Sequence, residues 1–360
     1  MPTSDASHRS VTDITDAPEE KYEKQEMLRE LRATFGERVV RAGEPLARHG
    51  TFGVGGPADA WITVAREDDL AKLVTLAAQH GWPLMLVGNG TNVLYADAGA
   101  KGIVARMADA IWRLEPTDLT DAAGQPLTRL IAGAGVSLPK LVNDLAERGL
   151  SGLEWGAGVP GTIGGGVISN AGAHGACIGD TLAGVRVLTA PASPDEEARI
   201  QALPTSALDL SYRHSRFRAA RRIVFDDEGR PTAAPRAPIE PTEMITGATF
   251  LLHQDDPAKI LKRVAQYKQH RKETQPPQPS AGSVFKNPPG DYSGRLIEAA
   301  GLKGTMLGKA QISPRHANFI VNTGGATAAD VVGLIALARR TVRERFGVEL
   351  ELEVELRGDW

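Results

Sequence analysis

The first clear hydrophobic periodicity lies between residues 58 and 88. Residues 58–64, ADAWITV, are typical of an extended segment, and 83–88, PLMLVG, form a short apolar run that breaks into GNGTN. The residues between these runs repeat at helical spacing, with one apolar face made of Leu70, Leu73, Val74 and Ala77. That face stops at Gly81, a residue type that commonly ends helices. The order predicts a strand, a helix and a buried strand with a glycine loop, which is a βαβ unit.

A second strand and helix follow in the same order. Residues 127–135, LTRLIAGAG, predict a strand, and Ser137 is a favourable N-cap for the helix after it. The buried stripe expected on that helix consists of Leu138, Leu141, Val142 and Leu145. Gly149 would end the helix, so the segment predicts a second unit of the same kind.

The remaining elements are shorter. Strands are expected at 182–189 and 244–252. Between them lie an arginine-rich segment, 208–222, and a proline- and alanine-rich stretch, 229–242, which predicts an exposed loop. Residues 256–279 predict a helix that is ended by its prolines, and we expect a domain boundary there.

Beyond that boundary the pattern alternates again. The elements expected are a helix at 295–304, a strand at 316–322, a long helix at 326–347 and a closing strand at 348–356. Alternation along the closing strand would bury Val348, Leu350, Leu352, Val354 and Leu356 on one face.

Composition and charge narrow the class of protein. A chain of 360 residues is long enough for two or three domains. Lys plus Arg number 41 against 44 Asp plus Glu, and the resulting net charge of -3 provides no global attraction to nucleic acid or an anionic membrane. Cys177 is the single cysteine, which excludes an intramolecular disulfide and a cysteine-based metal cluster and suits a reducing cytoplasm. Residues 1–25 lack the apolar region of a secretory signal and predict a disordered tail, and no apolar run is long enough to span a bilayer.

Residues 152–175, GLEWGAGVPGTIGGGVISNAGAHG, are unusually rich in glycine. Gly156, Gly158 and Gly161 fit the dinucleotide-binding pattern G-x-G-x-x-G, with Asp180 about 20 residues on. The context argues against a Rossmann site, because a helix rather than a strand precedes the pattern and TIGGG is a poor helix former. Close packing of a turn would explain two or three glycines. This stretch together with GNGTN instead favours a long ligand whose phosphates contact backbone N–H groups, and a flavin dinucleotide meets that description.

Several motifs in order resemble one family. TFGVGGPA at 51–58, VGNGTNVL at 87–94 and the glycine-rich stretch resemble the flavin-contacting segments of the UDP-N-acetylenolpyruvoylglucosamine reductase (MurB) family. YRHSRF at 212–217 and GSVFKNP at 282–288 resemble its Y-R-x-S-x-F and G-S-x-F-K-N-P, and 346–356 resembles its C-terminal F-G-x-x-L-E-P-E-V. The resemblance runs from about Thr51 to Glu353.

The resemblance implies an α+β protein. Its fold would comprise a two-subdomain FAD-binding part of the p-cresol methylhydroxylase and vanillyl-alcohol oxidase type, plus a C-terminal α/β substrate-binding domain. The boundaries we expect are a tail at 1–25, FAD-binding subdomain 1 at 26–103 joined by the C-terminal strand 346–360, subdomain 2 at 104–272, and the substrate-binding domain at 273–345.

The resemblance also implies a reaction. NADPH would reduce a non-covalently bound FAD, and hydride would then pass to the enolpyruvyl group of UDP-N-acetylglucosamine-enolpyruvate, giving UDP-N-acetylmuramate for peptidoglycan synthesis. The alternatives are an FAD-dependent oxidase of the same fold acting on a hydroxy acid or sugar, and a nucleotide- or nucleic-acid-binding module that uses the arginine-rich segment. If the chain is such a reductase, its partners are the small molecules UDP-sugar substrate and NADPH, and it binds neither nucleic acid nor membrane. We then expect a cytoplasmic monomer.

Site residues follow from the matched motifs. Arg213 would bind the substrate carboxylate, Glu353 would act with it, and Ser283 would donate a proton, helped by Lys286 nearby. The substrate-binding residues implied are Tyr212, Lys286 and Asn287, and no metal is expected. The FAD-binding residues implied are Thr51, Gly88, Asn89, Gly90, Thr91, Asn92, Gly156, Val159, Pro160, Gly161, Gly164, Gly165, Gly166, Ser169, Asn170 and Gly172. From the residues alone, Ser283 lies in an ordinary turn and the arginine-rich segment is typical of a solvated surface.

Overall fold

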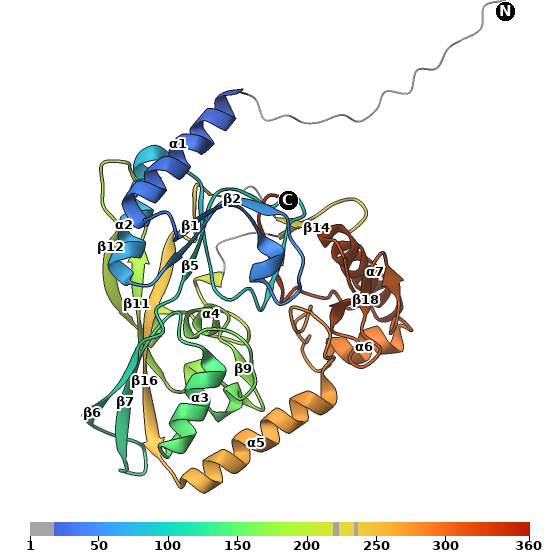
Figure 1. Cartoon of the computed structure of the whole chain (residues 1–360). Helices are drawn as coiled ribbons and strands as arrows, with labels where there is room; N and C mark the ends of the chain where they lie inside the picture. Colours follow the sequence, from blue (N-terminus) through green and yellow to red (C-terminus); the bar gives the residue numbers. More distant parts are fainter. Residues whose placement is uncertain (1–17, 219–222, 234–236) are drawn as a thin grey trace, which may run out of the picture.

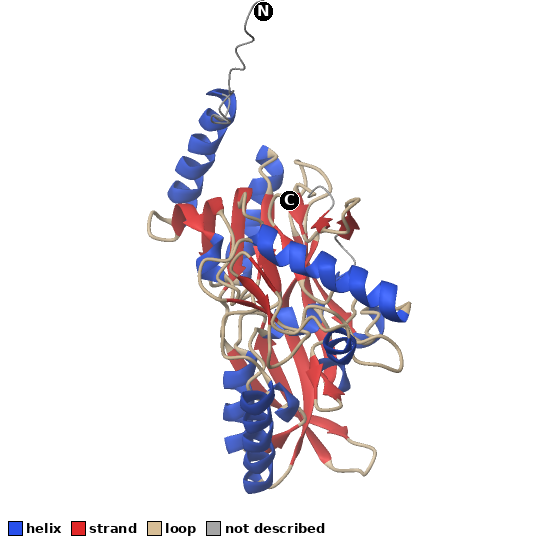
Figure 2. Cartoon of the chain, turned by 90° about the vertical axis from the view of Figure 1, so that its right-hand side faces the viewer, coloured by secondary structure: helices blue, strands red, loops and turns tan. Residues whose placement is uncertain are grey.

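The structure is a computed structural model that describes residues 18–218, 223–233 and 237–360. Two large sheets form the left part of the view in Figure 1, and the C-terminal helices form a separate body on the right. In Figure 2 the strands run through the middle of the molecule and most helices lie outside them. Across the described ranges, no helix combines the length and apolar character that crossing a bilayer demands.

The first sheet contains the predicted βαβ unit. Among the described residues its strand order is β1-β2-β5-β3-β15; β2, β5, β3 and β15 run parallel to one another, and β1 is antiparallel to β2. The bounds are β1 Val40–Pro45, β2 Pro57–Val64, α2 Glu67–His80, β3 Leu84–Val87, β5 Ala100–Met107 and β15 Ile239–Glu240. The predicted apolar face of α2 is fully buried, and Gly81, with φ +66°, ends the helix in the left-handed conformation. The unit is therefore confirmed.

The second sheet is antiparallel throughout its described pairs. Its order is β12-β11-β16-β7-β6, with β8 also paired to β16. The bounds are β6 Trp112–Thr120, β7 Pro126–Gly133, α3 Leu138–Glu147, β8 Leu150–Ser151, β11 Leu182–Thr189, β12 Arg199–Pro204 and β16 Glu243–Gln254. The prediction of a second βαβ unit is therefore wrong, because β7 pairs with the hairpin strand β6 and the returning strand β16. Ser137 does precede α3, but its side chain makes no capping hydrogen bond.

Helix α5, Pro257–Thr274, leads from the second sheet to the C-terminal region (Figure 1). Asp256 caps its first turn by accepting a hydrogen bond from the Ala258 N–H at 2.9 Å. The C-terminal region contains α6 Ser293–Ala299, β17 Met306–Leu307, β18 Ala310–Ile312, β19 Ile320–Asn322 and α7 Ala328–Phe346. These elements share a hydrophobic core that includes Phe285, Ile297 and Ile335, whereas the residues of the two large sheets pack in other cores. The exact domain boundaries stay predictions.

Three predicted segments differ in the structure. Helix α1, Pro18–Phe35, begins inside the predicted tail, so residues 18–25 are helical. The stretch 229–242 is only partly a loop, because β14, Pro231–Ala233, pairs with β13, Ile223–Phe225, and β15 extends the first sheet. Residues 1–17, 219–222 and 234–236, including Arg221 and Arg222 of the arginine-rich segment, lie outside the described residues.

The third difference is the closing strand. Only β20, Glu355–Arg357, is a paired strand, and it runs parallel to β4, Val93–Tyr95. Leu350, Leu352, Val354 and Leu356 are buried as the alternation predicted. The segment before β20 makes an isolated β-bridge, from Leu352 to Phe285, and does not form part of a continuous ladder. Alternation thus predicted the burial of these four residues correctly, whereas Val348 is only half-buried, and it predicted the strand incorrectly.

The glycine-rich stretch forms a short helix, α4, Ile163–Ile168, which the sequence did not predict. Thr162 caps it, with its Oγ1 accepting a hydrogen bond from the Gly165 N–H at 3.4 Å. Gly164 faces Ala134 so closely that an added Cβ would lie 2.9 Å from the Ala134 Cβ. Close packing and the cap therefore outweigh the low helix propensity of glycine, about 1 kcal/mol per residue relative to alanine.

Candidate functional site

A cavity of about 360 Å³ lies where the two sheets meet the C-terminal region. Most of its wall comes from four parts of the chain: residues 86–93, 159–173 around α4, 281–283, and 353–357. The wall is completed by Leu138, Arg213, Arg271, Gln275 and Phe319. Arg213, Ser283 and Glu353 all line it. Three residues that are far apart in the sequence are thus brought to one cavity together with both glycine loops.

Most of the predicted cofactor residues line this cavity. They are Gly88, Asn89, Gly90, Thr91, Asn92, Val159, Pro160, Gly161, Gly165, Gly166, Ser169 and Gly172. At three of these glycines, the only atom beyond the adjoining residues that an added Cβ would approach within 4 Å is a threonine hydroxyl oxygen. An added Cβ would lie 3.4 Å from Thr162 Oγ1 at Gly88, 3.3 Å from Thr91 Oγ1 at Gly161, and 3.6 Å from Thr162 Oγ1 at Gly165. A flat or phosphate-bearing ligand can therefore approach bare backbone here, which is the surface that a flavin dinucleotide needs.

Four predicted cofactor residues lie outside the cavity wall. Gly156 packs against Leu138, since an added Cβ would lie 3.0 Å from Leu138 Cγ, and Gly164 packs against Ala134. The Thr51 hydroxyl donates to the Ser280 carbonyl at 2.7 Å. These three positions serve packing and loop attachment in this structure.

Asn170 is the fourth residue outside the wall, and it holds the Arg213 loop. It is buried, its Nδ2 donates to the Ser211 carbonyl at 2.9 Å, and its Oδ1 accepts from the Gly179 N–H at 3.1 Å. The Ser215 hydroxyl adds a bond to the Ile168 carbonyl at 2.6 Å. The loop that carries Arg213 is therefore attached to the glycine-rich stretch.

Arg213 and Glu353 form an ion pair in the cavity. The Arg213 Nε donates to Glu353 Oε1 at 2.8 Å, and Arg213 Nη2 donates to the Gly172 carbonyl at 2.7 Å. Their side chains are only 21% and 16% exposed, so solvent screens the pair less than a surface bridge. Arg213 has φ +54°, a left-handed conformation that is uncommon for a residue with a long side chain. The Nη1 group takes part in neither bond.

Backbone pairing brings Ser283 next to Glu353. The Glu353 N–H donates to the Val284 carbonyl and the Lys286 N–H donates to the Glu351 carbonyl, both at 2.8 Å. Asn318 fixes the same segment, because its side chain accepts from the Phe285 N–H at 3.0 Å and donates to the Phe285 carbonyl at 2.8 Å. No sequence motif indicated this role for Asn318.

The predicted substrate-binding residues gather in another cavity. Tyr212, Lys286 and Asn287 line a hollow of about 560 Å³ together with Glu349 and Glu351. The Asn287 N–H donates to the Tyr212 hydroxyl at 3.4 Å. Lys286 Nζ forms an ion pair with Glu351 and is not part of the wall that contains Ser283. The structure therefore does not support the idea that Lys286 assists the Ser283 hydroxyl.

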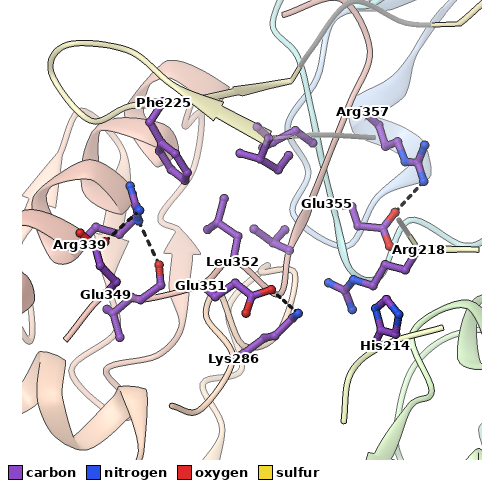
Figure 3. Close-up of a pocket in the computed structure, with 14 residues that line it drawn as sticks. His214, Arg218, Phe225, Lys286, Arg339, Glu349, Glu351, Leu352, Glu355 and Arg357 are labelled. Atoms are coloured by element: carbon purple, nitrogen blue, oxygen red, sulfur yellow. Dashed lines mark hydrogen bonds and ion pairs between the residues drawn. The ribbon is translucent and has the colours of Figure 1, made fainter. Parts of the chain in front are cut away.

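A further cavity, of about 640 Å³, adjoins the site and is shown in Figure 3. Glu355 and Arg357 line both this cavity and the one that contains Ser283. Arg357 pairs with Glu355 at 2.7 Å and also with the buried Glu240. Burial alone would raise the pKa of Glu355, but the charges of Arg357 and Arg218 outweigh it and the pKa is lowered. Both carboxyl and guanidinium groups are therefore charged at this wall.

Arg271 is a wall residue that the sequence did not predict. It lies near the end of α5, with its Cδ 3.4 Å from where a Cβ on Gly158 would be. Burial lowers the pKa of its guanidinium group, and no nearby acid offsets that effect. A partly buried cation that has no acidic partner among the described residues, in a cavity walled by glycine loops, suits an anionic ligand. Within the described chain, no cluster of His, Cys, Asp or Glu has the number of members that a metal site requires.

Comparison with known proteins bears on this geometry. Residues 58–193 match the FAD binding domain family, and that range contains both glycine loops. Residues 274–357 match the C-terminal domain of UDP-N-acetylenolpyruvoylglucosamine reductase. The reductase 2 of Symbiobacterium thermophilum is 39% identical over 320 residues, 89% of this chain and 92% of that protein.

The chain belongs to the UDP-N-acetylenolpyruvoylglucosamine reductase family. The reductase of Rubrobacter xylanophilus is also 39% identical, over 89% of this chain and 96% of its own. The crystal structure of the enzyme from Thermus caldophilus superposes with a TM-score of 0.65 at 34% identity, covering 88% of this chain and 97% of that one. The predicted family, its mixed α and β fold and its FAD-binding domain are thereby confirmed.

Proposed function

We propose that this chain reduces the enolpyruvyl group of UDP-N-acetylglucosamine-enolpyruvate to give UDP-N-acetylmuramate for peptidoglycan synthesis, using FAD and NADPH. The family assignment supports this activity. The observation that carries it is the convergence of Arg213, Ser283 and Glu353 on the cavity formed by the two glycine loops. An FAD site alone would fit many oxidoreductases, whereas this set of side chains suits an acceptor that bears a carboxylate.

The glycine loops would hold the cofactor. Residues 88–92 and 159–166 provide bare backbone for the pyrophosphate and the ring system, and Arg271 provides a positive charge for an anionic group. When bound, FAD accepts a hydride from NADPH and delivers it to the unsaturated substrate. We keep the prediction that FAD is bound without a covalent link.

Arg213 would bind the carboxylate of the enolpyruvyl group. As the double bond is reduced, negative charge develops on the carbon next to this carboxylate and on its oxygens. A guanidinium group that is already fixed by Glu353 and by the Gly172 carbonyl can stabilise that charge without reorganising. Nη1, which those two bonds leave out, is the group we assign to the carboxylate.

Ser283 would complete the reaction by donating a proton to the same carbon. It lines the cavity with Arg213 and Glu353, so one substrate can contact all three side chains. General acid help of this kind contributes typically about 10²- to 10⁴-fold to a rate. Water that enters through the same cavity would return the proton to Ser283.

The cavity of about 560 Å³ that Tyr212, Lys286 and Asn287 line would bind the nucleotide part of the substrate. Tyr212, Lys286 and Asn287 lie together there, next to the Arg213 loop and the Ser283 segment. An aromatic ring, a cation and an amide suit a sugar and a diphosphate. Because both co-substrates are soluble nucleotides, we propose that the enzyme works in the cytoplasm, and we retain the monomer as a prediction.

Anaerobic flavin spectroscopy tests the proposal. The purified protein, loaded with FAD, should lose its oxidised flavin absorbance on addition of one equivalent of NADPH. Adding UDP-N-acetylglucosamine-enolpyruvate should then restore the absorbance and yield UDP-N-acetylmuramate. A flavin that NADPH bleaches but that only oxygen restores would instead favour the oxidase reading.

A further inference from the structure

Arg218 contacts the backbone of both members of the Arg213 and Glu353 ion pair. Its Nη1 donates to the Arg213 carbonyl at 3.3 Å, and its Nη2 donates to the Glu353 carbonyl. Asn92, from the GNGTN loop, donates to the same Glu353 carbonyl at 2.9 Å. One guanidinium group therefore links two chain segments that are distant in sequence.

Both segments need such a link. Arg213 lies in a tight turn in which Ser211 and His214 form an isolated bridge, and its φ of +54° is unfavourable for a residue with a Cβ. Glu353 lies before β20 in a segment that has no continuous partner strand. Backbone bonds tie Glu353 to Val284, and side-chain bonds tie the Arg213 loop to the glycine-rich stretch. None of these bonds joins the two backbones to each other, so a side chain that spans them has a direct effect on the ion pair.

We propose that Arg218 is a positioning residue that holds the Arg213 guanidinium and the Glu353 carboxylate in the geometry needed for reduction of the substrate. The inference rests on the proposed function. Arg218 lines the cavity of Figure 3, and it is not part of the wall that contains Ser283. It acts through Arg213 and Glu353 and does not touch the cofactor or the reacting group.

The chain offers a matched control. Arg216 is two residues earlier and carries the same charge, but it pairs with Glu243 and donates to the Ala207 carbonyl at 3.3 Å, away from the site. Arg218→Met and Arg216→Met therefore remove one cation each from the same segment. Arg218→Lys keeps the charge but cannot span two carbonyls with a planar fork.

Stopped-flow measurement of the two half-reactions is the test. We expect Arg218→Met to slow reoxidation of the reduced flavin by the enolpyruvyl substrate on the order of 10²-fold, as for a reacting group displaced by about 1 Å. Flavin reduction by NADPH and FAD affinity should change less than about threefold, and Arg216→Met should change neither half-reaction. Arg218→Lys should recover part of the lost rate.

A double-mutant cycle with Arg213→Ala separates positioning from a general structural effect. If Arg218 acts through Arg213, adding Arg218→Met to Arg213→Ala should cause little further loss. Fully multiplicative losses, or equal losses in both half-reactions, would overturn the inference. If the wild-type flavin is not reoxidised by the substrate at all, the proposed function fails, and hydrogen exchange of residues 209–218 still decides the inference. Faster exchange in Arg218→Met than in Arg216→Met supports it, and unchanged exchange refutes it.

Discussion

Replacing Gly165 by alanine should stabilise the protein and weaken FAD binding at the same time. Gly165 lies in α4 and lines the cavity, and its added Cβ would meet only Thr162 Oγ1, at the ordinary contact distance of 3.6 Å. In a helix, alanine is favoured over glycine by about 0.8–1 kcal/mol, so the free energy of unfolding of the FAD-free protein should rise by about that amount.

The effect on the cofactor has the opposite sign. The new methyl group projects into the cavity, where we place the ligand against bare backbone. Forcing one extra methyl group into a filled contact costs about 1–3 kcal/mol, which corresponds to roughly 5- to 150-fold weaker FAD binding. Urea unfolding of the FAD-free protein gives the first quantity, and quenching of flavin fluorescence during titration gives the second.

Gly164→Ala is the matched control in the same helix. Its Cβ would lie 2.9 Å from Ala134 Cβ and 3.3 Å from the Ala134 carbonyl oxygen, so it should destabilise the FAD-free protein by about 1–3 kcal/mol. If Gly165→Ala gained stability and bound FAD as tightly as the wild type, α4 would not contact the cofactor and our placement would be refuted.

Three further substitutions test other parts of the site. Ser283→Ala should slow flavin reoxidation by the substrate at least about 10²-fold, while NADPH still reduces the flavin at nearly the wild-type rate. Stopped-flow absorbance measures the two half-reactions separately. Equal slowing of both half-reactions would mean that Ser283 is not the proton donor. Arg271→Gln should weaken FAD binding about 10-fold or more at low salt, and the binding should depend less on salt than in the wild type. The control Lys268→Met should leave FAD binding unchanged, because Lys268 Nζ donates to the Asn143 side chain at 2.7 Å. If the FAD titration curve of Arg271→Gln matched that of the wild type, Arg271 would not bind an anionic group of FAD. Gly90→Ala should prevent formation of the loop, because its Cβ would lie 2.2 Å from the His49 carbonyl oxygen at φ +60°, and a soluble variant with normal flavin content would contradict this.

Local patterns in the sequence predicted the elements better than their partners. The 3.6-residue period located α2, α3, α5 and α7, since each buries one face. The strand β7 was also located, but its neighbours were not, because the period of a strand says nothing about which strand will lie beside it. The closing segment shows the same limit, since its buried alternation is present without a continuous ladder.

Propensity misled the prediction at α4. Glycine disfavours helix, yet the cap from Thr162 and the close approach of Ala134 to Gly164 depend on contacts that a local pattern does not contain. The same limit applies to the stretch 229–242, where β15 forms because the edge of β3 is available to it. Tertiary contacts, rather than local preference, decided both segments.

The candidate site was predicted mainly by the resemblance of its motifs. Arg213, Ser283 and Glu353 carry no pattern of their own, and only their order along the chain pointed to a shared cavity. Arg271, Arg218 and Asn318 had no signal, because each acts on a segment that is remote in sequence. Asn170 stays a predicted cofactor residue, and its side chain contacts Ser211 of the Arg213 loop and the Gly179 N–H.

The pairing of β20 with β4 also sets the order in which the site can mature. The GNGTN loop is completed by a bond from Asn92 to Glu353, 261 residues later, and Glu353 lies just before the last strand of the chain. During synthesis the N-terminal sheets can fold first, but the ion pair with Arg213 cannot form until Glu353 has left the ribosome. The site is thus without its ion pair until residue 353 has been made and released, and a truncation before Glu353 would remove the ion pair and the β20 partner of β4 together.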